Sequence, residues 1–376
     1  MGNAAVTVLS SLRALHVFFS TGSDACSHTD HKEPVMRNIF TAALVLLSAS
    51  FATAQTVAPA PSNPDEPLAP TLSPTNAAKF MDTVGLAWTR QRKCMTCHTT
   101  VPYMLARPKL GGDPKPMREV RRFLEATVIE WGNSKPRRDY DVVATAVALT
   151  WNDVATTGKL HSTTRAALDK VWTVQLEDGS WNWPDCAWPP LEHDQFYSVA
   201  YVAVAVSMAP ANYRDTPAAK AGLDKIRGYL RENPTTELHH KTTLLWASAK
   251  IDGLLSDEEK KATIAELRKL QLPDGGWNTP ALGPYAKRRG GEIENDMAVS
   301  DGYATGFVTY VLRQTGTATD DPALKKAIKW LKANQRESGR WFTQSPGGSK
   351  AQYLTNVSSM FAILALDACG EKLTAE

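Results

Sequence analysis

Two cysteines and a histidine within five consecutive positions form the motif of this sequence with the most specific chemistry. Cys94 and Cys97 are separated by two residues, and His98 follows directly. Two thiols at this spacing can form thioether bonds to the two vinyl groups of a haem, while the adjacent imidazole coordinates the iron. The motif therefore predicts one covalently attached haem c, with His98 as a ligand of the metal.

The same three side chains are compatible with other chemistry. The thiols could form a disulfide or a thioredoxin-like redox pair, and the three side chains could bind zinc together with one further ligand. Export of the protein would favour haem, because thioether attachment of haem takes place outside the cytoplasm. The second axial ligand of such a haem stays open between Met104, Met117, His161, His193, His239 and His240.

Three aspartates stand at the start of apolar segments that we expect to be helices, and they are the candidate catalytic acids. They are Asp141, Asp194 and Asp301. Asp is also a favoured helix cap and suits the positive end of the helix dipole, so capping is the alternative role of each. A tyrosine lies next to each position or close to it, and these three could line a cavity or belong to the core: Tyr140, Tyr197 and Tyr303.

A repeated pattern shows which elements position these residues. Residues 175–181, 271–277 and 335–341 all read Gln-x-x-x-Gly-x-Trp, and apolar residues stand four and seven positions before each Gln, on one face of a helix. We expect the Gly to end that helix in a left-handed conformation and the Trp to fold back over the helix end. A fourth helix, residues 77–91, is followed by the Cys94 motif in place of Gly-x-Trp.

Amphipathic and apolar segments alternate along the chain. The apolar segments are residues 99–106, 142–151, 196–208, 242–255, 298–312 and 354–366, and amphipathic helices such as 117–131 and 217–230 lie between them. This alternation predicts an all-α fold, an (α/α)6 toroid of about six helical hairpins with the apolar helices inside. All connections from outer to inner helices then emerge on one rim, together with the Cys94 motif and the longest loops.

The Gln-x-x-x-Gly-x-Trp segments resemble the QW repeats of squalene-hopene and oxidosqualene cyclases, and the helical register is similar to that of the wider prenyltransferase and squalene-oxidase repeat group. The resemblance covers residues 77–366. It implies a terpenoid-cyclase-like toroid in which the repeats tie outer helices together and perform no chemistry.

The active sites of that group do not carry over. Its cyclases protonate a polyene with the motif Asp-x-Asp-Asp-Thr-Ala, and the most similar stretch here, residues 139–146, lacks the paired Asp-Asp. Cationic cyclisation needs a carboxylic acid that its neighbours keep strongly acidic. The zinc ligands of the protein prenyltransferases have no counterpart at the spacing of that family.

The N-terminal part of the sequence indicates export. Met36 opens a short basic start, an apolar run at residues 39–51 and a small-x-small site ending at Ala54, the three parts of a signal peptide. The run is too short for a stable transmembrane anchor. We therefore expect a mis-assigned extension at residues 1–35, a signal peptide at 36–54 cleaved near Ala54, a Pro-rich linker at 55–75 and a single toroid domain at 76–370, in a periplasmic or secreted protein.

Composition and charge exclude some partners. The chain is 43% hydrophobic and 22% charged with a net charge of +3, which is typical of a globular protein. Its Lys and Arg residues are scattered along the helical segments, which argues against a nucleic-acid surface. In an oxidising compartment Cys186 and Cys369 could pair.

Together these features predict an exported c-type haem protein on a squalene-cyclase-like toroid, with a redox partner or an apolar, isoprenoid-like ligand at the rim of the ring. Two alternatives stay open at this point. One is a terpenoid cyclase that uses Asp141, Asp194 or Asp301 as proton donor. The other is a non-catalytic binding module with a structural metal or a disulfide at the Cys94 motif.

Overall fold

The computed structural model describes residues 59–132, 136, 138–184, 194–283, 296–345 and 352–374. The predicted N-terminal extension, the predicted signal peptide, Cys186 and His193 lie outside these residues. Among the described residues, no helix is long and apolar enough to cross a membrane. Residues 52–376 form one compact unit.

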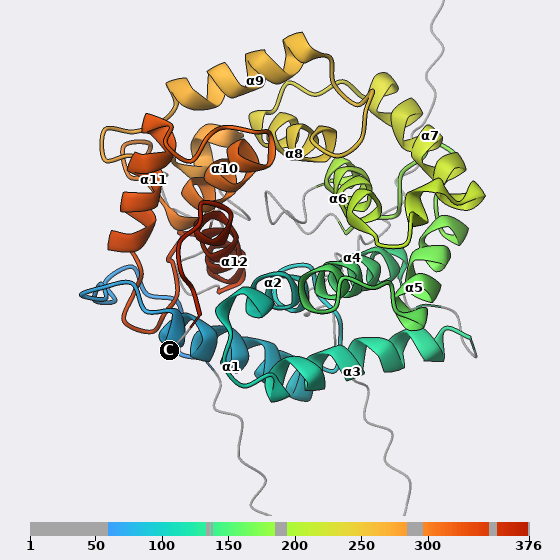
Figure 1. Ribbon diagram of the computed structural model, residues 1–376, viewed down its shortest axis with the longest axis horizontal. Coiled ribbons are helices and arrows are strands. Elements are labelled where there is room, and N and C mark those ends of the chain that lie inside the picture. The colour runs from blue at the N-terminus through green and yellow to red at the C-terminus, as the bar shows by residue number, and fades with distance from the viewer. Residues whose placement is uncertain are drawn as a thin grey trace, which may run out of the picture. The chain divides into compact units, whose positions relative to one another are not determined.

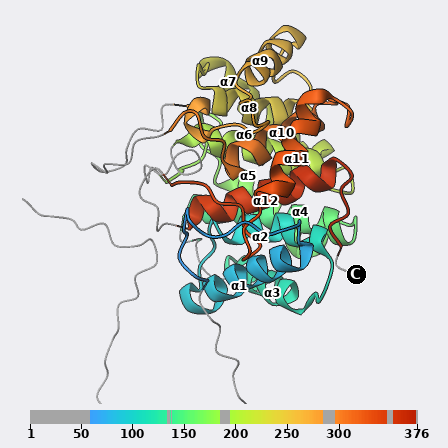
Figure 2. The ribbon, with the colours of Figure 1, turned by 90° about the vertical axis from the view of Figure 1, so that its left-hand side faces the viewer.

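Two concentric rings of helices make up this unit (Figures 1 and 2). The outer ring consists of α1 (Pro74–Arg92), α3 (Lys115–Glu130), α5 (Ser162–Thr173), α7 (Pro217–Glu232), α9 (Asp257–Lys269) and α11 (Pro322–Ala333). The inner ring consists of α2 (Thr100–Ala106), α4 (Asp139–Thr156), α6 (Gln195–Met208), α8 (Leu238–Ser248), α10 (Gly302–Gln314) and α12 (Tyr353–Ala368). Helix α12 packs against α2 and closes the inner ring. The predicted all-α toroid of six hairpins is confirmed.

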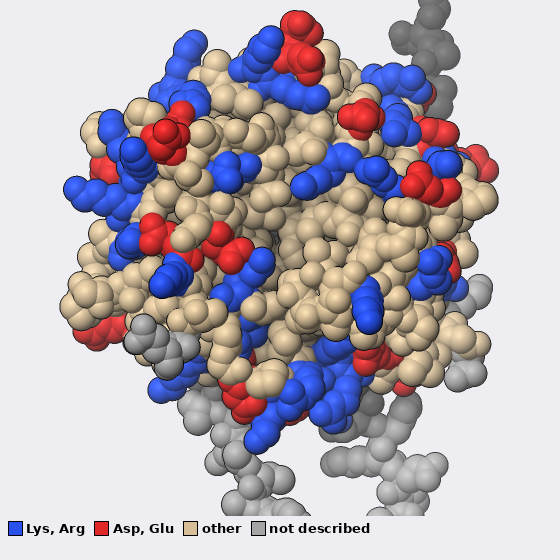
Figure 3. All heavy atoms as spheres, viewed as in Figure 1, with Lys and Arg blue, Asp and Glu red and all other residues tan. Residues whose placement is uncertain are grey.

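The amphipathic outer helices and the apolar inner helices differ in how much of their surface is buried. In outer helix α3 only Val120, Leu124 and Val128 are buried, and their spacing of four places them on one stripe that faces the inner ring. In inner helix α12 every residue from Leu354 to Leu366 is buried. Helices that are apolar all round are thus surrounded by protein, while the outer helices cover them with one face. Figure 3 shows both basic and acidic side chains around the edge of the face seen in Figure 1.

Two inner helices differ from their predicted bounds. Helix α8 begins four residues before the predicted segment 242–255 and ends at Ser248, because the chain turns through Gly253 at a φ of +77° while apolar residues continue into the turn. Helix α10 begins at Gly302, four residues later than predicted, because the Asp301 carboxylate caps it by accepting a hydrogen bond from the backbone N–H of Ala304.

The three Gln-x-x-x-Gly-x-Trp segments form equivalent clamps between outer helices. Each Gln side chain donates to the carbonyl of its own Gly and to a second carbonyl in the N-terminal part of the next outer helix or just before it. The second acceptors are Gly222 of α7 for Gln175, Ala323 of α11 for Gln271, and Ser73 before α1 for Gln335. Each Trp is buried and its indole N–H donates to the carbonyl ten residues earlier: Val171 for Trp181, Leu267 for Trp277 and Leu331 for Trp341. The Trp therefore folds back over the helix end, as expected.

The glycine of each clamp lies beyond the helix and does not end it. Helix α5 ends at Thr173, whereas Gly179 lies in the following turn, with a φ of +94°. A Cβ atom on Gly179 would lie 2.3 Å from the carbonyl oxygen of Lys225 in α7, and one on Gly339 would lie 2.1 Å from the backbone of Asn76 in α1. The glycine is required both for the turn and for the close approach of the next helix.

The last clamp joins the two ends of the domain. The Gln335 side chain accepts from the backbone N–H of Ser73 at 2.6 Å and donates to its carbonyl at 3.0 Å, although 262 positions separate the two residues. The described part of the predicted Pro-rich linker also lies against this region. The buried Arg340 guanidinium donates to the carboxylate of Glu66 and to the carbonyls of Ala60 and Pro61. From residue 59 onward, the linker is thus held by the ring.

We predict that Gly339→Ala destabilises the domain much more than Gly316→Ala. Both glycines have a φ of +93°, but a Cβ on Gly316 meets no atom within 4 Å. The left-handed backbone alone costs an alanine about 1 kcal/mol, and the clash with Asn76 should raise the total at residue 339 above about 3 kcal/mol. Urea unfolding of both variants measures the difference. Equal losses of stability would contradict the role of Gly339 in the contact between α11 and α1.

Candidate functional site

All inner helices follow outer helices that run the other way, so the inner helices begin at one end of the ring. Aromatic and imidazole side chains gather there, and we call this set the mouth: His98, Tyr140, Tyr197, His239, Tyr303 and Tyr353. They come from the starts of α4, α6, α8, α10 and α12 and from the turn before α2. The rim predicted to carry the chemistry is therefore rich in groups that can exchange protons and stack on a ligand.

At the centre of the mouth, His239 and Tyr303 form a hydrogen bond. The Nε2 atom of His239 and the hydroxyl oxygen of Tyr303 are 2.7 Å apart, and the two residues are 1% and 0% exposed. The imidazole also packs on Phe307, with ring centres 5.2 Å apart. Burial raises the pKa of Tyr303 well above its usual value, so its hydroxyl keeps its proton at neutral pH. The pair joins a phenol that can donate a proton to an imidazole that can accept one.

An aromatic wall continues from this pair toward α4. Tyr197 lies 6.4 Å from His239 between ring centres, Trp183 lies 5.8 Å from Tyr197, and Tyr140 lies 6.0 Å from Trp183. Burial raises the pKa of Tyr197 well above its usual value, so this phenol also stays neutral. The three rings of the wall are buried, at 3–8% exposure, and bring aromatic faces and phenol hydroxyls together.

Charged and amide groups lie beside the wall at the start of α4. The Arg138 guanidinium lies 5.4 Å from the ring centre of Tyr140 and donates to its hydroxyl at 3.1 Å. The side chain of Asn182 donates to Asp139 at 2.7 Å. These side chains are half-buried or exposed, which adds accessible polar groups to the aromatic surface.

His98 belongs to the other side of the mouth and packs between two aromatic rings. Its ring centre lies 4.0 Å from that of Tyr353 and 5.0 Å from that of Trp88. Its Nδ1 atom is 2.8 Å from the hydroxyl of Thr99, which in turn accepts from the side chain of Asn356 in α12. His98 thus contributes to the contact between α2 and α12.

The two cysteines of the motif have different environments. Cys94 is in a disulfide, and its partner lies outside the described residues, because Cys97 and Cys369 both keep their thiols. Cys97 is 3% exposed. A sulfur in a disulfide cannot at the same time form a thioether to a porphyrin, so this disulfide and the predicted haem attachment are alternatives, and the covalent haem stays a prediction. No group of three or more His, Cys, Asp or Glu that could hold a metal occurs among the described residues.

The three candidate acids have separate partners. Asp301 accepts at Oδ1 from the hydroxyls of Thr279 and Thr343 and from the Ala304 N–H, and at Oδ2 from the Thr279 N–H, over 2.6–3.2 Å. Burial raises the pKa of Asp301, although these hydrogen bonds act in the opposite direction. Asp301 therefore caps α10 and ties it to two loops.

Asp194 and Asp141 have less enclosed positions. Asp194 is the N-cap residue of α6, and its carboxylate lies 2.9 Å from Nε2 of His240 in α8. Asp141 lies half-buried in the first turn of α4. The structure gives each acid a local role at the start of a helix, and the groups in closest contact at the centre are His239 and Tyr303.

The remaining ligand candidates have ordinary surroundings. Met104 is fully buried in α2, the Met117 sulfur accepts from the side chain of Asn152 at 3.4 Å, and the exposed His161 lies 3.1 Å from the hydroxyl of Thr157. Sequence reasoning named His239 only as a possible iron ligand and Tyr303 only as a possible cavity residue. Both residues stand near the start of neighbouring apolar helices, and this shared position in the sequence could have indicated that they lie close together.

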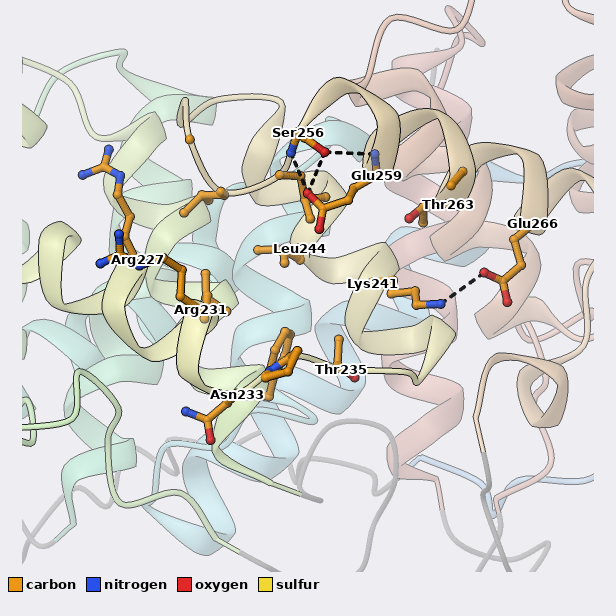
Figure 4. A pocket seen from close by; sticks show the side chains of 17 residues that line it. Arg227, Arg231, Asn233, Thr235, Lys241, Leu244, Ser256, Glu259, Thr263 and Glu266 are labelled. Carbon is orange, nitrogen blue, oxygen red and sulfur yellow. Dashed lines mark hydrogen bonds and ion pairs between the residues drawn. The ribbon is translucent and has the colours of Figure 1, made fainter.

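A separate groove opens between the outer helices α7 and α9, with α8 as its floor (Figure 4). Its volume is about 600 Å³. Arg227 and Arg231 lie on one side, Lys241 and Glu266 on the other, and Leu244 between them. Its lining residues are spread over four helices and the segments between them without a motif, so the groove could not be predicted from the sequence.

No protein-family model and no curated protein matches this chain. Solved structures share its fold at low identity. A polysaccharide lyase is 11% identical with a TM-score of 0.47, over 78% of this chain and 97% of the lyase. The ent-copalyl diphosphate synthase from Streptomyces platensis is 15% identical with a TM-score of 0.47, over 72% and 50% of the two chains. A possible member of the GH105 family from Klebsiella pneumoniae is 13% identical with a TM-score of 0.46, over 72% and 80%.

The predicted haem-binding, cytochrome-like function is wrong. The structure places Cys94 in a disulfide, which removes one of the two thiols that the attachment requires. The Cys94 motif lies at the point of its repeat where the other repeats carry a clamp.

We predict that Cys94 is protected from alkylation until the protein is reduced. Of Cys94 and Cys369, iodoacetamide should modify only Cys369 in denatured, unreduced protein, because Cys94 is in a disulfide and Cys369 keeps its thiol. After reduction both should react, and peptide mass spectrometry gives the extent at each position. Alkylation of Cys94 without reductant, or a porphyrin mass on its peptide, would contradict the disulfide.

The raised pKa of Asp301 predicts a pH-dependent effect on stability. Because the folded state binds this proton more tightly than the unfolded state, Asp301 contributes most below its ordinary pKa of 3.8 and less as pH rises through the folded pKa. The stability of the wild type relative to Asp301→Asn should therefore fall with rising pH. Urea unfolding of both proteins between roughly pH 3.5 and pH 7 tests this. A wild type that becomes more stable relative to Asp301→Asn as pH rises would refute the prediction.

Proposed function

We propose that this protein is a carbohydrate-processing enzyme of the lyase type, which cleaves an acidic polysaccharide at the mouth of the ring with His239 and Tyr303. The observation that carries the proposal is the 2.7 Å hydrogen bond between the two side chains within an aromatic wall. A neutral phenol beside an imidazole supplies an acid and a base at one point.

The chemistry of the wall fits a sugar chain. A pyranose ring has apolar C–H faces and hydroxyl groups at its edge. Trp183, Tyr140 and Tyr197 offer ring faces for the former, while Asp139 and Asn182 offer polar partners for the latter. Arg138, half-buried next to Tyr140, supplies positive charge for a carboxylate on the sugar.

The contact between His239 and Tyr303 favours elimination over hydrolysis with inversion. Inverting hydrolases hold their acid and base about 6.5–9.5 Å apart to leave room for a water molecule. At 2.7 Å the two groups leave no such room and must act on the same side of the substrate. In elimination, His239 accepts the proton from the carbon next to the carboxylate, and a C=C bond forms as the C–O bond breaks. Tyr303 protonates the departing oxygen.

The same hydrogen bond allows the two groups to recover their starting states. After one turnover His239 has gained a proton and Tyr303 has lost one, so transfer along the hydrogen bond returns both to neutrality. Burial supports this direction, because it raises the pKa of Tyr303 and disfavours a lasting phenolate. No other proton carrier is needed for the cycle.

We predict that Tyr303→Phe abolishes lyase activity while leaving the fold intact. The variant keeps the buried ring and removes only the hydroxyl, so the rate should fall by about 10²–10⁴-fold. The measurement is the ultraviolet absorbance of the unsaturated product on a panel of polyuronates and glycosaminoglycans. Tyr310→Phe is the matched control, because it removes a buried hydroxyl from the same helix away from His239 and should keep full activity.

Two results would overturn the proposal. One is release of reducing ends without ultraviolet absorbance, which would indicate hydrolysis. The other is an active enzyme in which Tyr303→Phe and Tyr310→Phe have equal rates. Thermal unfolding of both variants shows whether a loss of activity reflects a loss of structure.

A further inference from the structure

The groove between α7 and α9 lies at a junction of the outer ring that has no Gln-x-x-x-Gly-x-Trp clamp. Helices α5, α9 and α11 are each followed by a Gln-x-x-x-Gly-x-Trp segment that ties them to the next outer helix. After α7 the chain reads Asn233-Pro234-Thr235 instead. About 600 Å³ is left between the two helices over the floor formed by α8. This volume is within the range of about 300–1,000 Å³ typical of small-molecule sites.

The inside of the groove is apolar. Leu230, Leu254 and Leu255 are half-buried along its walls, and Leu244 and Phe196 form the floor at 7% and 6% exposure. Figure 4 shows Leu244 between the two walls. An occupant that removes these side chains from water gains about 25 cal/mol for each Å² of apolar surface buried.

The charged groups at the edges of the groove leave an excess of positive charge for a ligand. Glu259 is occupied by the backbone N–H and the hydroxyl of Ser256, and these hydrogen bonds lower its pKa. Glu266 pairs with Lys241 at 3.4 Å, and Arg227 pairs with Asp224 at 2.8 Å. For Arg231, which is exposed, no carboxylate among the described residues lies within 4.0 Å. Glu259 and Glu266 thus both have partners, whereas Arg231 can pair with the carboxylate of a ligand.

We propose that this groove binds an amphiphile with an apolar body and a carboxylate, such as a medium-chain fatty acid. The hydrocarbon chain lies on the leucines and Phe196, and the carboxylate lies at the edge near Arg231 and Lys241. Charge favours the anion, since Glu259 and Glu266 already have partners, whereas Arg231 has no carboxylate within 4.0 Å among the described residues. The site is separate from the mouth, so it is independent of the proposed lyase activity.

Isothermal titration calorimetry with dodecanoate, below its micelle concentration, tests the proposal. We expect one dodecanoate bound per chain, and binding of dodecyltrimethylammonium at least about tenfold weaker. No binding of dodecanoate, or equal binding of the two amphiphiles, would overturn the proposal.

Two substitutions in α9 test whether the ligand lies in the groove. Ala262→Trp places a large ring in the groove from α9 and should weaken dodecanoate binding by about tenfold or more. Ala265→Trp, at an exposed position of the same helix that does not line the groove, should leave binding unchanged. Equal affinities of these two variants would overturn the site.

A second pair of substitutions tests the charge. Arg231→Gln should weaken binding by about two- to fivefold, as expected for a partly exposed ion pair. Lys225→Gln removes the same charge from an exposed position of α7 outside the groove and should have no effect. Equal effects of the two substitutions would refute the role of Arg231. Tyr303→Phe should bind dodecanoate with unchanged affinity, so loss of lyase activity and loss of groove binding are distinguishable.

Discussion

The structure depends on one contact between distant parts of the chain, the pair of hydrogen bonds between Gln335 and Ser73. A ring of hairpins buries its inner helices only when its last hairpin meets its first. The fully buried Gln335 makes this junction and joins α11 to the start of α1 in the way that Gln175 and Gln271 join other outer helices. A buried amide with all its partners in place fixes the distance between the helices that it connects. The packing of α12 on α2, and with it the mouth, depends on this closure.

Much of the fold could be predicted from the sequence, because the repeats encode packing directly. The offsets of apolar residues before each Gln define the buried stripe of an outer helix, and the near-complete apolarity of segments such as α12 defines the inner ring. The bounds of α8 and α10 could not be read in this way. Apolar residues continue past the end of α8 because the groove lies next to that turn, and α10 begins where Asp301 caps it.

The candidate site was harder to predict, since a motif gives residue types and spacing but not bonding partners. The spacing of Cys94, Cys97 and His98 fits haem attachment, but spacing alone does not show that Cys94 is in a disulfide. His239 and Tyr303 are 64 positions apart, and only the ring brings them to 2.7 Å. The three aspartates were found by their position at helix starts, which is also why capping or helix pairing accounts for Asp301 and Asp194.

Adjacent residues His239 and His240 connect α8 to both of its neighbours. His239 reaches Tyr303 of α10, while the next side chain along, His240, reaches Asp194 at the start of α6. Successive side chains of a helix diverge by about 100°, so only one rotational setting of α8 satisfies both contacts. A slip of α8 by a single residue would break them together. The contacts of α8 with α6 and with α10 are therefore formed together.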